Sequence, residues 1–179
     1  YYHKAIDLYA ETLGLKHSKV AQVKYNLALI ANKFGEYSVS QVLLQNVLST
    51  YRTVFGEQHP STANAYGALS SVFLLQDDLE KALFYTTKER DVISKLYGPQ
   101  HPDIAYSNLN IGKIYASKNQ LNLAEQQFKI GISILEAAGK KENDTYIQLV
   151  IKLASVLQDK SELKKAELLL KNLITQQQI

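Results

Sequence analysis

The chain has 179 residues, of which 46% are hydrophobic and 21% charged, a composition that is ordinary for a globular domain with a sizeable core. It contains no cysteine, which excludes disulfides and thiolate chemistry. The net charge of +3 is spread along the chain, and no window approaches the roughly 18 apolar residues of a membrane span. We therefore expect neither a nucleic acid nor a membrane as partner.

The first predicted helix covers residues 1–13. Tyr2, Ile6, Tyr9 and Leu13 recur at helical spacing, and the pattern then meets a glycine at position 14. Glycine commonly closes a helix because it tolerates a positive φ. We expect this helix to be the second half of a repeat whose first helix is missing, so that the chain is part of a longer one.

The next stretch predicts a complete helical hairpin. Apolar residues fall on one face of residues 18–33, Gly35 breaks the pattern, and a second amphipathic helix follows over residues 36–54. Short connections of this kind join antiparallel neighbours.

Residues 56–60, Gly-Glu-Gln-His-Pro, return as Gly-Pro-Gln-His-Pro at 98–102, which is 42 residues later. Glycine ends one helix, and proline suits the first position of the next because its φ is already helical. The same register finds His17 upstream of His59 and His101. We expect these histidines to pack or cap at the corners and to bind no metal, because helices about 8 to 10 Å apart hold them too far from one another.

The same helical pattern recurs at steps of 42 residues and predicts the remaining hairpins, with turns at Asp77-Asp78 and at Asn119. In the fourth copy Asn143 and Asp144 replace the His-Pro entrance, and either side chain can cap a helix. We expect one domain with these divisions: 1–14, 15–56, 57–98, 99–140 and 141–179.

Equivalent positions of the four copies carry a family pattern. In the first helices Ala28, Ser70, Gly112 and Ala154 are small, and a column of the second helices contains Leu44, Thr86, Phe128 and Leu170. The pattern resembles the tetratricopeptide repeat, and its 42-residue length with Gly-x-x-His-Pro at the junction is similar to the repeats of kinesin light chains. The resemblance implies an all-α fold, a right-handed superhelical α-solenoid of antiparallel helix hairpins.

The second hairpin departs from this pattern. Thr86 and Glu89 stand where the other copies place apolar or small residues. A buried carboxylate needs a partner. We expect a local shift that lets Glu89 reach solvent, in preference to a buried pair.

No arrangement of catalytic residues is present. The sequence lacks a phosphate-binding glycine loop, a two-histidine zinc helix and a nucleophile elbow. The acidic pairs Asp77 with Asp78 and Glu142 with Asp144 lie at turns or helix entrances, where they are typical caps. We expect no enzyme, cofactor or metal.

The resemblance implies a concave groove lined by the first helix of each repeat. The residues that it places there are Gln22, Tyr25, Asn26, Lys33, Asn64, Ser71, Tyr106, Asn110, Lys113, Gln148 and Lys152. An asparagine amide both donates and accepts hydrogen bonds and can hold a peptide backbone, whereas lysines favour carboxylates. For any one of these residues, simple solvation of an open face is the alternative.

We therefore expect a cytoplasmic scaffold or adaptor segment that binds an extended acidic or mixed peptide, as part of a longer chain or larger assembly. Asn110, Lys113 and Lys152 are fragments of a clamp for a terminal carboxylate, but Ala68 and Ser71 lack the matching groups. The alternative is a structural spacer in a cytoskeletal, ciliary or microtubule-associated assembly, with contacts on convex and edge surfaces. A third hypothesis is a regulatory appendage of an enzyme.

Overall fold

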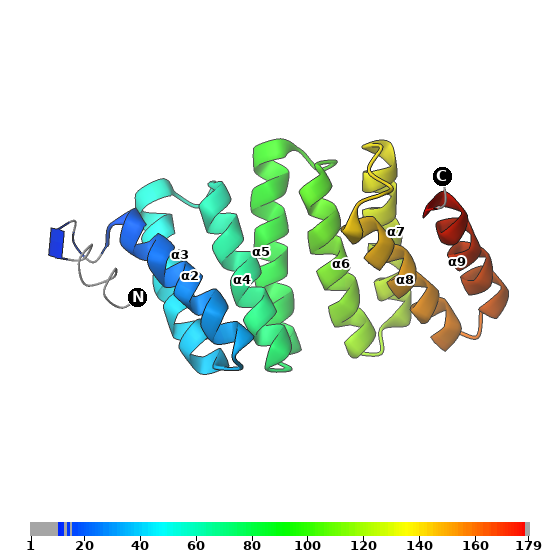
Figure 1. Cartoon of the computed structure of the whole chain (residues 1–179), viewed down its shortest axis with the longest axis horizontal. Helices are drawn as coiled ribbons and strands as arrows, with labels where there is room; N and C mark the ends of the chain where they lie inside the picture. The colour runs from blue at the N-terminus through cyan, green and yellow to red at the C-terminus, as the bar shows by residue number, and fades with distance from the viewer. Residues whose placement is uncertain (1–10, 13, 15, 178–179) are drawn as a thin grey trace. The chain divides into compact units, whose positions relative to one another are not determined.

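The computed structural model describes residues 11, 12, 14 and 16–177. Within them the chain is helical and contains no strand, as predicted (Figure 1). The helices are α2 (Ser18–Lys33), α3 (Tyr37–Phe55), α4 (Pro60–Leu75), α5 (Leu79–Tyr97), α6 (Pro102–Ser117), α7 (Leu121–Ala137), α8 (Asp144–Asp159) and α9 (Leu163–Gln177). The helix predicted over residues 1–13 lies outside the described residues, apart from helical positions 11 and 12.

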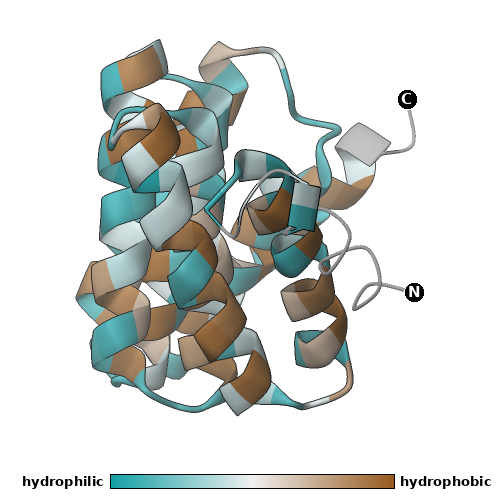
Figure 2. Ribbon diagram, turned by 90° about the vertical axis from the view of Figure 1, so that its left-hand side faces the viewer, coloured by the Kyte–Doolittle hydropathy of each residue, from teal (hydrophilic) through white to brown (hydrophobic). Residues whose placement is uncertain are grey.

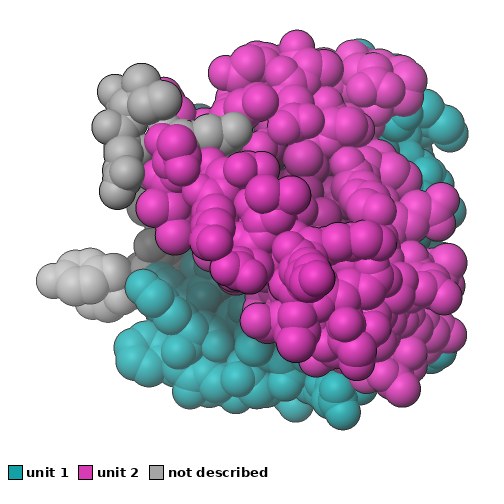
Figure 3. Space-filling view, turned by 90° about the vertical axis from the view of Figure 1, so that its right-hand side faces the viewer, with its two compact units in different colours: residues 1–96 teal, residues 97–179 magenta. Residues whose placement is uncertain are grey.

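The helices form two compact units, residues 1–96 and 97–179 (Figure 3). In the first unit α2 packs against both α3 and α4. In the second, α6 packs against α7 and α8, and α8 packs against α9. Within each unit, α2 and α6 therefore contact both their own hairpin partner and the first helix of the next hairpin, which is the packing expected of a repeat array.

Histidine caps the entrance of three first helices. Nδ1 of His17, His59 and His101 accepts a hydrogen bond from the backbone N–H two residues later, at 3.1, 3.1 and 3.3 Å. The ring of His59 also stacks on Phe55, with centroids 4.4 Å apart. Asn143 caps α8 in the same way, because its Oδ1 accepts a hydrogen bond from the backbone N–H of Thr145 at 2.7 Å. The predicted capping role of these four residues is confirmed.

One backbone motif closes every first helix. Gly35, Asp77, Asn119 and Ser161 have φ of 80°, 59°, 56° and 63°. The next N–H bonds back across the turn each time, for example from Asp78 to the carbonyl of Phe73 at 2.9 Å and from Gln120 to that of Tyr115 at 2.8 Å. This left-handed residue with a six-to-one hydrogen bond is the Schellman ending of a helix. The predicted turns at Gly35, Asp77-Asp78 and Asn119 are therefore confirmed.

Apolar side chains fill the interior of each unit. Hydrophobic and hydrophilic residues alternate along the helices (Figure 2). In the second unit the small residue Gly112 admits the ring of Phe128, because a Cβ at position 112 would overlap that ring. Among the described residues no helix is long and apolar enough to cross a membrane.

The interior of the second hairpin contains several polar side chains, and one expectation about it is wrong. The Ser70 and Thr86 hydroxyls lie within hydrogen-bonding distance of each other and of the carbonyl of Ala82, so that one hydroxyl donates to the carbonyl and the other donates to its partner hydroxyl. Glu89 does not reach solvent: it is only 8% exposed. Its carboxylate lies against Gly67, whose missing side chain leaves the space. A glycine on α4 thus removes the need for the helix shift that the sequence suggested.

Candidate binding surface

The predicted binding residues lie on the first helices α2, α4, α6 and α8. All but one are exposed or half-exposed, which leaves them accessible to a ligand. The exception is Asn110, which is 9% exposed within α6. Asn26 and Lys152, at the equivalent positions of the other hairpins, are half-buried and exposed. The three residues therefore do not present a uniform row of side chains.

In the first unit three predicted residues line one small pocket. Gln22 and Tyr25 of α2 and Asn64 of α4 surround a pocket of about 40 Å³, together with Tyr51 and Ser61. The Tyr51 hydroxyl lies 3.5 Å from Oε1 of Gln22. Burial raises the pKa of Tyr51, and the neighbouring Tyr25 raises it further. The pocket therefore offers neutral amides and hydroxyls, which suit an uncharged polar group or a water molecule.

In the second unit the predicted residues bring two positive charges together. Lys113 of α6 is half-exposed, and its Nζ lies 3.5 Å from Oε1 of Gln148 on α8. Lys152, one turn further along α8, is exposed. Burial lowers the pKa of Lys113, and the positive charge of Lys152 lowers it further. In the described part of the chain neither ammonium forms an ion pair with a carboxylate.

This lysine pair differs from Lys129 and Lys160 of the same unit, which share a carboxylate. Lys129 and Lys160 both bind Glu125 at 2.6 Å, and their hydrogen bonds lower the pKa of its carboxyl. Lys113 and Lys152 instead repel each other in partly desolvated surroundings. An anion placed between them relieves that repulsion, so this position is the most favourable one for a carboxylate among the predicted residues.

Some predicted residues lie neither in the small pocket of the first unit nor beside the lysine pair of the second. Asn26, Lys33 and Ser71 are absent from the described lining of the small pocket, and the Ser71 hydroxyl donates to the carbonyl of Gly67 within its own helix. The sequence reasoning missed Tyr51 and Ser61 as lining residues. Tyr51 belongs to the apolar face of its helix, where a tyrosine is a typical core residue, so no sequence signal distinguishes it.

The terminal-carboxylate clamp retains only part of its residues. Lys113 and Lys152 lie in the same region, but Asn110 is largely covered within its unit. The amide of a clamp has to face the ligand to donate to it. The side chains thus offer two cations and the amide of Gln148, without the accessible asparagine that the clamp requires.

Comparison with known proteins finds sequence similarity to a repeat family and to two groups of curated proteins. Residues 19–91 match the model of the tetratricopeptide repeat. The chain is 27% identical over 161 residues to the clustered mitochondria protein homolog of Danio rerio, a match that covers 87% of this chain and 12% of that protein. It is 26% identical over 141 residues to the protein kinesin light chain-related 1 of Arabidopsis thaliana, covering 78% of this chain and 23% of that one. The chain thus spans a small part of these relatives.

Solved structures share the fold. BtubC (BKLC) from P. vanneervenii superposes with a TM-score of 0.84 at 19% identity, covering 97% of this chain and 72% of that one. A putative kinesin light chain from Podosopora anserina with nearly identical TPR-like repeats superposes with a TM-score of 0.81 at 18% identity, covering 98% and 83%. These likenesses confirm the predicted α-solenoid of tetratricopeptide-like hairpins.

Proposed function

Because the chain is a tetratricopeptide repeat array of the kinesin-light-chain-like type, a family of protein-interaction scaffolds, we propose that it binds an extended peptide segment of a partner protein through its first helices. The peptide carries at least one carboxylate, which lies between Lys113 and Lys152. The chain acts by binding and not by catalysis. The names of the relatives support a cytoplasmic, cytoskeleton-associated setting.

The lysine pair of α6 and α8 is the observation that carries this proposal. A surface lysine normally keeps its ordinary pKa or gains from a neighbouring carboxylate. Lys113 has the opposite environment, because burial and Lys152 both disfavour its charge. A ligand carboxylate would supply the missing counter-charge, and the Gln148 amide beside it can pair with a peptide group.

The test uses a fluorescein-labelled peptide of about ten residues in which glutamates alternate with serines, since an extended chain of this length spans about 33 Å. A matched peptide has glutamine in place of every glutamate. We expect the acidic peptide to bind the intact chain more tightly, by about tenfold or more, and to weaken with added salt. Fluorescence anisotropy measures both affinities.

Variants locate the peptide. Lys113→Gln and Lys152→Gln are expected to weaken the acidic peptide at least about tenfold each, since each removes a charge from the same place. Lys88→Gln is the matched control, because Lys88 is an exposed cation on α5, a second helix. Equal affinity for both peptides, or an equal loss in the control variant, would show that the first-helix lysines are not the binding site.

A further inference from the structure

The outer face of α3 is almost free of charge. The helix has 19 residues and a single charged one, Arg52. Its solvent-facing residues at spacings of three and four form a stripe along the helix, which we name the α3 stripe: Val39, Val42, Asn46, Ser49 and Thr53. All five are exposed, and Val39 and Val42 are 49% and 57% exposed. Exposed helix faces normally carry charged residues, so this surface calls for an explanation.

Two of the three polar members of this face, Asn46 and Thr53, donate a hydrogen bond within the helix. Asn46 donates to the carbonyl of Val42 at 2.9 Å, and Thr53 donates to that of Ser49 at 2.9 Å. The neighbouring Thr50 donates to the carbonyl of Asn46 at 3.0 Å. A partner that covers the stripe therefore removes few unpaired donors from water, which keeps the desolvation cost low.

A hollow lies on each side of the stripe. One, of about 500 Å³, is lined by Gln45, Leu48, Ser49, Arg52, Thr53 and Glu57. The other, of about 250 Å³, is lined by Lys16, Lys24, Asn46, Ser49, Thr50 and Thr53. Because Ser49 and Thr53 line both, the C-terminal half of the stripe is a ridge between two grooves. Ridges and grooves at spacings of three and four are the surface that a second helix packs against.

The equivalent face of α5 shows that the repeat itself does not require such a stripe. Forty-two residues later the same positions carry Lys81, Phe84, Lys88, Asp91 and Lys95, all exposed. The Lys88 ammonium covers the ring of Phe84 at 5.7 Å, as on a solvated surface. The face of α7 is uncharged as well, with Leu123, Gln126, Ile130, Ser133 and Ala137, but the Glu125–Lys129 ion pair flanks it.

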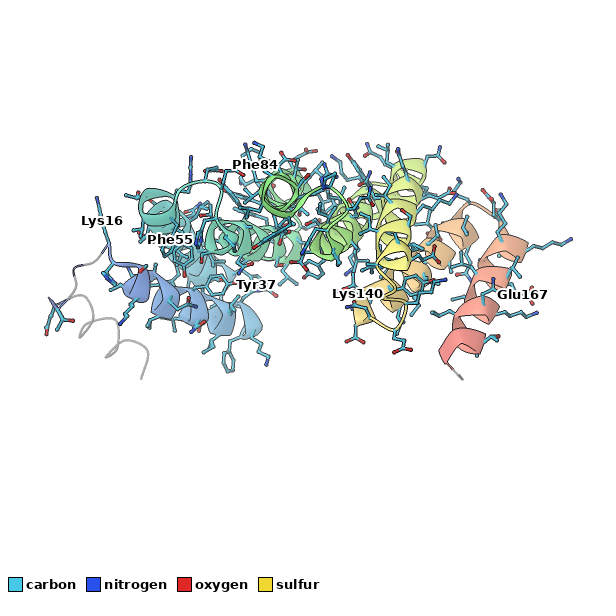
Figure 4. All side chains as sticks on the ribbon, turned by 90° about the horizontal axis from the view of Figure 1, so that it is seen from above. Lys16, Tyr37, Phe55, Phe84, Lys140 and Glu167 are labelled. Carbon is cyan, nitrogen blue, oxygen red and sulfur yellow. The ribbon has the colours of Figure 1, made fainter. Side chains whose placement is uncertain are left out.

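The charges beside the α3 stripe indicate the chemistry of its occupant. Arg52 is neutralised by Glu57 at 2.7 Å. Lys16 and Lys24 line the opposite hollow, and neither pairs with a carboxylate within the residues that the structure covers. Figure 4 shows the Lys16 side chain extending away from the ribbon. The uncompensated charge at this edge is therefore positive.

We propose that the α3 stripe docks an amphipathic helix of a partner protein. That helix carries a stripe of small apolar residues at heptad spacing, and acidic residues along the edge that meets Lys16 and Lys24. The surface belongs to a second helix of the first unit, whereas the lysine pair of the proposed peptide site belongs to first helices of the second unit.

The test uses a synthetic helical peptide of about 21 residues, or three heptads, with alanine and leucine at the a and d positions and glutamate along one flank. A matched peptide has lysine on that flank. The full chain should bind the glutamate peptide about tenfold or more tightly than the lysine peptide. The double variant Lys16→Glu/Lys24→Glu should reverse this preference. Fluorescence anisotropy reports the affinities, and circular dichroism confirms that the variants are folded.

A second pair of variants locates the surface. Val42→Glu/Ser49→Glu alters two exposed positions and should weaken the glutamate peptide about tenfold or more, whereas Phe84→Glu, at the position equivalent to Val42 on α5, should change it less than about twofold. Equal binding of the two peptides, or no effect of Val42→Glu/Ser49→Glu, would overturn the proposal. So would sedimentation equilibrium showing self-association that Val42→Glu/Ser49→Glu abolishes, since the occupant would then be a second copy of this chain.

Discussion

The ring of Phe128 occupies the space that a Cβ on Gly112 would need. Phe128 is 1% exposed, so its ring has no open space into which to move. The equivalent pairs of the first and fourth hairpins are Ala28 with Leu44 and Ala154 with Leu170. The size of the small residue is thus adjusted to that of the large one across each hairpin, which is how a repeat keeps its helix spacing while its residues change.

The fit between Gly112 and Phe128 predicts a destabilising alanine. Gly112→Ala improves helix propensity by about 1 kcal/mol, but overpacking a closed core costs about 1–3 kcal/mol. We expect a net loss of about 1 kcal/mol in the free energy of unfolding, measured by urea denaturation. The double variant Gly112→Ala/Phe128→Leu installs the pair of the first hairpin and should recover part of the loss. Simple additivity of the two single changes would contradict the proposed fit.

The histidine caps predict which replacements are tolerated. His101→Ala removes the acceptor for the N–H of Asp103 and should lower the free energy of unfolding by about 1 kcal/mol. His101→Asn should be nearly neutral, because Asn143 caps α8 with the same geometry. Thermal unfolding of the two variants distinguishes them. An equal loss in both would mean that the histidine acts through its ring contact with Tyr97 and not through the cap.

Tyr66 predicts a stability change at high pH. Burial and the hydrogen bond to Glu57, 2.5 Å long, raise its pKa to about 12. The raised pKa means that the folded state holds the Tyr66 proton more tightly than the unfolded state does. The protonated hydroxyl therefore contributes its full stabilisation below the ordinary tyrosine pKa near 10, and this stabilisation is lost as pH rises towards 12. Tyr66→Phe should cost about 1–2 kcal/mol at pH 8 and less at pH 11. Urea unfolding at both pH values checks this, and a constant difference would contradict it.

Lys152→Gln should raise the pKa of Lys113, because it removes the positive charge that opposes protonation there. Burial remains, so the pKa should stay below the ordinary lysine value. Since the lowered pKa disfavours the charged form in the folded state, the variant should gain about a few tenths of a kcal/mol at neutral pH, and less in high salt. NMR titration of labelled lysines measures the pKa. An unchanged Lys113 titration would show that the two ammonium groups do not interact.

Much of the local structure could be predicted from the sequence. The 42-residue offset located the helix boundaries, because glycine, histidine and proline at a junction each have one strong conformational preference. The caps and turns depend on only a few neighbouring residues, so they too could be assigned without the tertiary structure. The pairing of helices into hairpins followed from short connections and from apolar faces at helical spacing.

The sequence alone could not determine which side chains meet across helices. Glu89 was expected in solvent because a buried carboxylate needs a partner, and only the packing of α5 on α4 brings it over Gly67. Asn110 was placed by analogy on an open face, although its neighbours cover it. Local preferences act over a few residues along the chain, whereas burial and the pKa of Lys113 depend on groups about 40 residues away, and only the folded molecule brings those groups together.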